Sequence, residues 1–95
     1  MKLIRDNIVE IMREEGKTPK TRIADNREYV ELLRLKLQEE VKEYLDSKSP
    51  EELADVLEVL RALAEHHLDD FSNLESLRKE KARVRGGFKR RIVLE

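Results

Sequence analysis

Cysteine is absent from the 95 residues, which excludes disulfides, zinc-thiolate sites, iron–sulfur clusters and cysteine nucleophiles. Aromatic residues make up only 4% of the chain, so platforms that stack the bases of single-stranded nucleic acid are not expected. No apolar run approaches the roughly 20 residues that a membrane helix requires. The chain is charged from Lys2 onward, so we expect no signal peptide, no membrane association and a cytoplasmic location.

Charged residues, in contrast, are abundant. They make up 43% of the chain, with 20 Lys and Arg against 21 Asp and Glu, so the net charge is only −1. The charged fraction of ordinary globular domains is roughly 25%. A balanced, leucine-rich composition of this kind favours long amphipathic helices over disorder. The length fits one small domain, and we expect a single domain over residues 1–95.

Capping residues and apolar periodicity predict an all-α fold of four helices. We expect the helices at about residues 7–15, 26–45, 50–67 and 72–85, with capping boxes at 25–28, 49–52 and 72–75. The turn after the second helix is short, so the second and third helices should form an antiparallel central pair. Residues 91–94 have strand character, and a short strand pair with residues 2–4 is a further expectation.

Each of the two central helices carries two acidic residues three positions apart, and residues three apart share a helix face. The pairs are Glu40 with Glu43 and Glu52 with Asp55. Helical angles place each pair to the matching side of an apolar stripe, so antiparallel packing gathers all four carboxylates into one patch. The stripes are Val30, Leu33, Leu37, Val41 and Tyr44 on the second helix and Leu53, Val56, Leu57, Leu60 and Ala64 on the third.

Two interpretations of this patch remain open. Carboxylates three apart arise often in so charged a chain, and such acids can simply form a solvated helix surface. Two like charges about 4 Å apart, however, repel by about 1 kcal/mol in water and about 4 kcal/mol at an effective dielectric near 20. A divalent ion would relieve this repulsion, and an oxygen-only set suits Mg²⁺, with Mn²⁺ as the alternative. The neighbouring Glu39 points further from the core and is a candidate base rather than a ligand.

Positive charge gathers near the C-terminus. Residues 78–95 carry a net charge of +6, which leaves −7 on the preceding residues. Lys79, Arg83 and Arg85 could bind phosphate oxygens, for which a guanidinium is well suited. The same residues could instead form a solvated last turn that complements the helix dipole. A different class of function is a non-enzymatic module that binds RNA or an acidic partner through this segment.

The pattern Glu39-Glu40-x-x-Glu43 followed by Glu52-x-x-Asp55 resembles the paired motif of the all-α nucleoside triphosphate pyrophosphohydrolases. This superfamily includes MazG, dimeric dUTPases and phosphoribosyl-ATP pyrophosphohydrolase. Both ends of the chain, residues 2–6 and 79–88, are similar to a short subgroup, the phosphoribosyl-ATP pyrophosphohydrolase-like proteins. The resemblance covers nearly the whole chain and implies a MazG-like helical bundle.

The resemblance also implies a reaction. Glu40, Glu43, Glu52 and Asp55 would coordinate Mg²⁺, and water would split the α–β phosphoanhydride of a nucleotide into a nucleoside monophosphate and pyrophosphate. Members are commonly dimers or higher oligomers, which implies a homo-oligomer here. Apolar residues beyond the main stripe of the second helix agree with this, because they indicate a second buried surface, covered by the outer helices or by another subunit.

Two features depart from the family pattern. Only eight residues separate Glu43 from Glu52, fewer than in many MazG-type members, which leaves less room for a loop that reads the base. Asn7 and Val9 stand where lysine and proline are expected in the subgroup, which weakens the case for a substrate role of the N-terminus. Arg5 is interpreted as part of a local ion pair at a helix cap.

Overall fold

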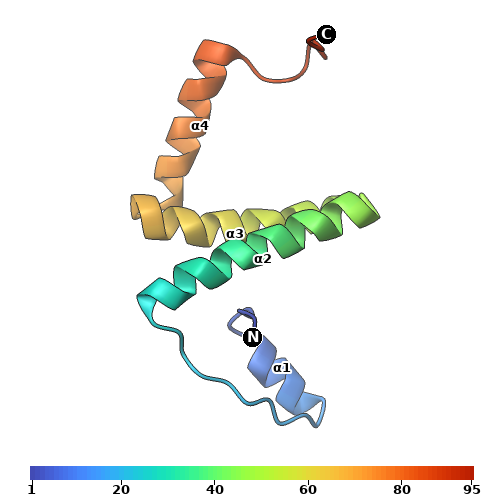
Figure 1. Cartoon of the computed structure of the whole chain (residues 1–95), viewed down its shortest axis with the longest axis vertical. Helices are drawn as coiled ribbons and strands as arrows, with labels where there is room; N and C mark the ends of the chain where they lie inside the picture. Colours follow the sequence, from blue (N-terminus) through green and yellow to red (C-terminus); the bar gives the residue numbers. More distant parts are fainter. The chain divides into compact units, whose positions relative to one another are not determined.

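The structure is a computed structural model that describes all of residues 1–95, and it contains four helices and no strand (Figure 1). The helices are α1 (Ile8–Glu14), α2 (Asn26–Ser47), α3 (Pro50–Leu68) and α4 (Phe71–Arg85). The predicted all-α fold class with four helices is therefore confirmed. The expected strand pair does not form, because residues 2–4 and 91–94 have no strand structure. None of the four helices combines the length and the apolar character needed to cross a membrane.

The chain forms two compact units, Met1–Leu60 and Arg61–Glu95. The first unit holds α1, α2 and the first turns of α3, and the second holds the last turns of α3 together with α4. The boundary falls inside a continuous helix, and the single domain over residues 1–95 stays a prediction.

The ends of α2 are set by Asp25 and Lys48. The carboxylate of Asp25 accepts a hydrogen bond from the backbone N–H of Glu28 at 2.9 Å, as expected of a cap. The Glu28 side chain does not complete the box, because the guanidinium of Arg22 binds both of its oxygens, at 2.5 and 2.6 Å. Lys48 takes a left-handed conformation with φ of 58°, and α3 begins two residues later at Pro50. Within the first unit, α2 and α3 therefore lie antiparallel, as predicted (Figure 1).

Helix α4 begins one residue earlier than predicted. Its cap is Asp70, whose carboxylate accepts a hydrogen bond from the backbone N–H of Ser72 at 2.8 Å. The assignment of Ser72 as the cap is wrong, since aspartate caps a helix at least as well as serine and comes first in the chain. The helix ends at Arg85, before Gly86 with φ of 82°, as the glycine predicted.

The buried face of α2 includes a charged residue. Val30, Leu33 and Glu40 are buried, whereas Val41 is 38% exposed. The predicted stripe is thus wrong at Val41, because the helix turns Glu40 inward in its place.

The inward face of α3 is displaced in the same way. Val59 is buried and the side chains of Glu52 and Asp55 are half-buried. Leu53 and Leu57, which the sequence pattern placed in the core, are 49% and 52% exposed. The prediction is wrong for these two residues, because the face of α3 turned toward α2 includes Glu52 and Asp55. Ala64 of the predicted stripe is buried, as expected.

Candidate metal site

Carboxylates from α2 and α3 converge in the first unit. Oxygen atoms of Glu40, Glu52 and Asp55 all lie within 4.8 Å of one another, and so do oxygen atoms of Glu39, Glu40 and Glu43. Glu40 belongs to both groups and so links the acids of the two helices. We call these five residues the acidic cluster. Of the four acids that the sequence singled out as ligands, the structure thus brings Glu40, Glu52 and Asp55 into one group. Glu43 lies in the other group, which shares Glu40, and the role of all four as ligands stays a prediction.

Glu40 is the charged residue that the fold buries, with 7% of its surface exposed. Its Oε1 lies 3.3 Å from Nζ of Lys36, but its Oε2 is buried and has no hydrogen-bond partner. A buried polar atom left without a partner costs about 1–3 kcal/mol, and more when it is charged. Such an atom calls for an explanation, and a cation among converging carboxylates provides one. The donor set consists of oxygen alone, which fits a hard divalent cation.

Three basic side chains contact acids of the acidic cluster. Nζ of Lys36 lies 3.4 Å from Oε2 of Glu39, in addition to its contact with Glu40. Nζ of Lys2 lies 3.3 Å from Oε1 of Glu39. Nη2 of Arg5 donates a hydrogen bond to Oδ1 of Asp55 at 2.7 Å.

Sequence reasoning missed these three partners. The local ion pair expected for Arg5 is wrong, because its carboxylate partner lies 50 positions further along the chain. No local spacing encodes such a contact. The available signal was electrostatic, since a patch of several carboxylates requires nearby cations to limit its repulsion. Lys36 was within reach of sequence analysis, because it precedes Glu39 and Glu40 by three and four positions on one helix.

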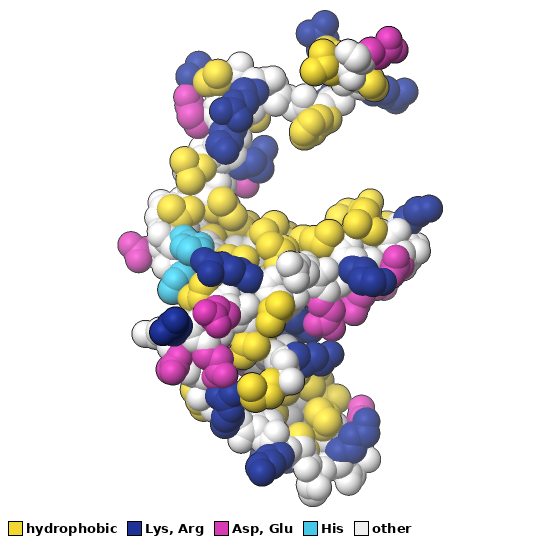
Figure 2. Space-filling view, viewed as in Figure 1, with side chains coloured by type: hydrophobic (Ala, Val, Ile, Leu, Met, Phe, Trp, Pro, Cys, Tyr) yellow, Lys and Arg dark blue, Asp and Glu magenta, His cyan; other side chains and the backbone are white.

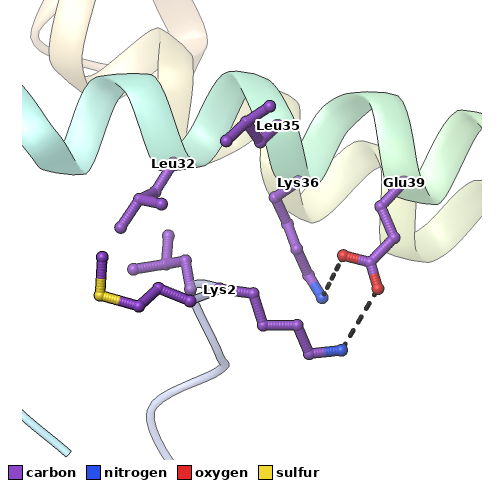
Figure 3. Close-up of a pocket in the computed structure, with 7 residues that line it drawn as sticks. Lys2, Leu32, Leu35, Lys36 and Glu39 are labelled. Carbon is purple, nitrogen blue, oxygen red and sulfur yellow. Dashed lines mark hydrogen bonds and ion pairs between the residues drawn. The ribbon is translucent and has the colours of Figure 1, made fainter.

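A pocket adjoins the acidic cluster at Glu39. It is lined by Met1, Lys2, Leu3, Leu32, Leu35, Lys36 and Glu39, and it measures about 220 Å³ with its open mouth included. Figure 3 shows Lys2 and Lys36 each reaching a different oxygen of the Glu39 carboxylate, with the apolar side chains of Leu32 and Leu35 further along α2. Apolar and charged side chains thus line the same pocket.

Three acids of the cluster, Glu39, Glu43 and Glu52, have shifted pKa values. The adjacent carboxyl group of Glu40 and its negative charge raise the pKa of Glu43. Burial raises the pKa of Glu52, and its hydrogen bond with Asp55 and the charge of that residue add to the effect. Burial opposes ionisation of Glu39 as well, but hydrogen bonds and charge from Lys2 and Lys36 lower its pKa. Glu39 therefore stays ionised to a lower pH than Glu43 and Glu52.

The raised pKa values of Glu43 and Glu52 predict a pH dependence of metal binding. Both groups take up protons at a higher pH than ordinary glutamates, and a protonated carboxyl does not bind Mg²⁺. We expect the Mg²⁺ affinity measured by calorimetry to fall as the pH is lowered from about 7 to about 5. Glu43→Gln should weaken binding at pH 7 and flatten this dependence. An affinity that is constant over the interval contradicts the expectation.

The predicted phosphate-binding residues Lys79, Arg83 and Arg85 lie on α4 in the second unit. Basic side chains are prominent on this helix (Figure 2). Nη2 of Arg83 pairs with Oε1 of Glu80 one turn earlier, at 2.7 Å. The phosphate-binding role of these residues stays a prediction.

Comparisons of the chain with protein-family models, curated proteins and solved structures found no match. A function for the chain therefore rests on the acidic cluster and on the sequence pattern.

Proposed function

We propose that the chain is a Mg²⁺-dependent hydrolase of nucleotides, with Mn²⁺ as the alternative ion. It would split the α–β phosphoanhydride of a nucleoside triphosphate or related nucleotide and release a nucleoside monophosphate and pyrophosphate. The observation that carries the proposal is the buried Oε2 of Glu40, which has no partner among carboxylates from two helices. The resemblance to the all-α nucleoside triphosphate pyrophosphohydrolases supports the reaction class.

The four candidate ligands are Glu40, Glu43, Glu52 and Asp55, two from each helix. When bound, the ion neutralises phosphate oxygens and lowers the pKa of a water molecule. Glu39 stands at the edge of the cluster, between Lys2 and Lys36, with its pKa lowered. The two lysine contacts keep Glu39 ionised but also make it a weaker base, and we assign it this role because it is the one acid of the cluster outside the four proposed ligands.

A non-enzymatic module that binds RNA or an acidic partner through residues 78–91 is the second candidate. Two of its cations already pair with carboxylates on their own helix, since Arg78 contacts Glu75 and Arg83 contacts Glu80. This function also gives no reason for a buried carboxylate oxygen without a partner. The hydrolase accounts for more of the structure.

We propose in addition that the enzyme is a homo-oligomer. Apolar side chains are exposed along the α2–α3 pair (Figure 2), with Val41, Leu45, Leu53 and Leu57 between 38% and 62% exposed. Burying apolar surface contributes about 25 cal/mol per Å², so covering these residues with a second copy would be favourable.

The proposed reaction is tested with a panel of ribonucleotides and deoxyribonucleotides in saturating Mg²⁺. We expect pyrophosphate and the matching nucleoside monophosphate to appear in equal amounts from at least one nucleotide, and chelation of the metal to stop the release. Release of inorganic phosphate alone would indicate cleavage at a different bond. The absence of pyrophosphate across the panel would overturn the proposal. Steeply salt-dependent RNA binding by such an inactive chain would support the second candidate.

A further inference from the structure

The N-terminal segment supplies one cation to each helix of the acidic cluster. Lys2 contacts Glu39 on α2 at 3.3 Å, and Arg5 contacts Asp55 on α3 at 2.7 Å. The first contact is drawn in Figure 3, where Lys2 extends toward the carboxylate of Glu39. The two partners lie 37 and 50 positions away in the sequence. These pairs are therefore products of the tertiary fold of the first unit.

Both ion pairs are open to solvent. The side chains of Arg5 and Asp55 are 53% and 41% exposed, and those of Lys2 and Glu39 are 63% and 34% exposed. Exposed pairs of this kind contribute only about 0–1 kcal/mol to stability, so they exchange partners readily. The two ion pairs therefore add little to the stability of the fold, and stability alone does not explain the positions of Lys2 and Arg5.

The contact of Arg5 places it in competition with the proposed metal ion. Asp55 belongs to the group of three acids around Glu40, and its Oδ1 accepts the hydrogen bond from Arg5. An ion that binds Asp55 would weaken the hydrogen bond and ion pair between this carboxylate and the guanidinium of Arg5. A guanidinium released from Asp55 would lie beside the acidic cluster, where an anion bound to the ion would be a new partner for it.

We propose that Arg5, assisted by Lys2, is the group that binds the phosphates of the substrate. Arg5 contacts Asp55 in this structure, and with an ion on Asp55 it would be free to bind phosphate oxygens instead. The planar fork of a guanidinium matches phosphate oxygens in a bidentate manner. This assigns to the N-terminal segment a role that the sequence pattern gave to Lys79, Arg83 and Arg85, and it rests on the proposed function.

The test compares Arg5→Gln with the matched control Arg13→Gln, which removes the same charge from the last turn of α1. The probes are Mg²⁺ alone and inorganic pyrophosphate in saturating Mg²⁺, both followed by calorimetry on the full chain. We expect Arg5→Gln to bind Mg²⁺ alone as tightly as the unmodified chain or several-fold more tightly, because a competitor for Asp55 has gone. Pyrophosphate should bind about 10- to 100-fold more weakly. Arg5→Lys should show a smaller loss, because it keeps the charge without the fork.

Three results would overturn this inference. They are pyrophosphate affinity unchanged in Arg5→Gln, an equal loss in Arg13→Gln, and no binding of pyrophosphate by the unmodified chain. The outcome is separable from that of the proposed function. Nucleotide hydrolysis with an unchanged KM in Arg5→Gln would overturn the inference and leave the function standing. Pyrophosphate binding that depends on Arg5, in a chain that hydrolyses no nucleotide, would do the reverse.

Discussion

Replacement of Glu40 by glutamine is expected to abolish nucleotide hydrolysis while the helices stay folded. Glu40 is the only residue that belongs to both groups of converging carboxylates. The change keeps the size of the side chain and removes the charge that would hold the ion. A metal ion stabilises the charge of the transition state by several kcal/mol, so we expect kcat/KM to fall by about 10³-fold or more. Pyrophosphate release measures the loss, and far-ultraviolet circular dichroism checks the fold.

Glu58→Gln is the matched control for this substitution. Glu58 is exposed on α3 and lies outside both groups of converging acids, so its loss removes an equal charge from the same helix pair. Hydrolysis should be close to normal in this variant. If Glu40→Gln kept substantial activity, or if both variants lost activity alike, the assignment of Glu40 to the metal site would be wrong.

Mg²⁺ is expected to raise the melting temperature of the chain. The metal-free cluster combines carboxylates in mutual repulsion with a buried oxygen that has no partner, and a bound ion relieves both. Linkage gives about 2.7 kcal/mol of stabilisation when the free ion is at 100 times its dissociation constant. For a domain of this size, that corresponds to an increase of roughly 10 °C or more. Thermal melts with and without Mg²⁺ measure it.

The control for the melting experiment is Na⁺ at equal ionic strength, which screens charges without binding to a specific site. It should produce a much smaller increase. The increase caused by Mg²⁺ should be absent from Glu40→Gln. Equal effects of the two salts would show that general screening, and not a metal site, stabilises the cluster.

The convergence of the acids could be predicted because it depends on local rules. Spacing of three positions puts Glu40 with Glu43 and Glu52 with Asp55 on one face of each helix. The short turn at Lys48 then forces the helices to run antiparallel, which brings the matching faces together. No long-range information is needed for this step.

The burial of Glu40 could not be predicted in the same way. Hydrophobicity alone places Val41 in the core, and angles of about 100° per residue place Glu40 to one side of it. The fold instead buries Glu40 and leaves Val41 exposed. A prediction based on apolar periodicity places only apolar residues in the core, so it cannot identify a buried carboxylate such as Glu40. Departures of this kind are expected most often at functional sites.

The contacts of Lys2 and Arg5 were also beyond sequence reasoning. Their partners lie 37 and 50 positions away, and neither periodicity nor capping signals extend over such separations. Only the tertiary structure could place these cations against the acidic cluster.

Direct titration of the chain with Mg²⁺ in a calorimeter, at neutral pH and without nucleotide, is the most direct test of joint metal binding by α2 and α3. We expect saturable binding that is lost in Glu40→Gln and also in Glu52→Gln, since the proposed site takes ligands from both helices. Absence of binding by the unmodified chain, or binding that survives both substitutions, would contradict a metal site between these helices.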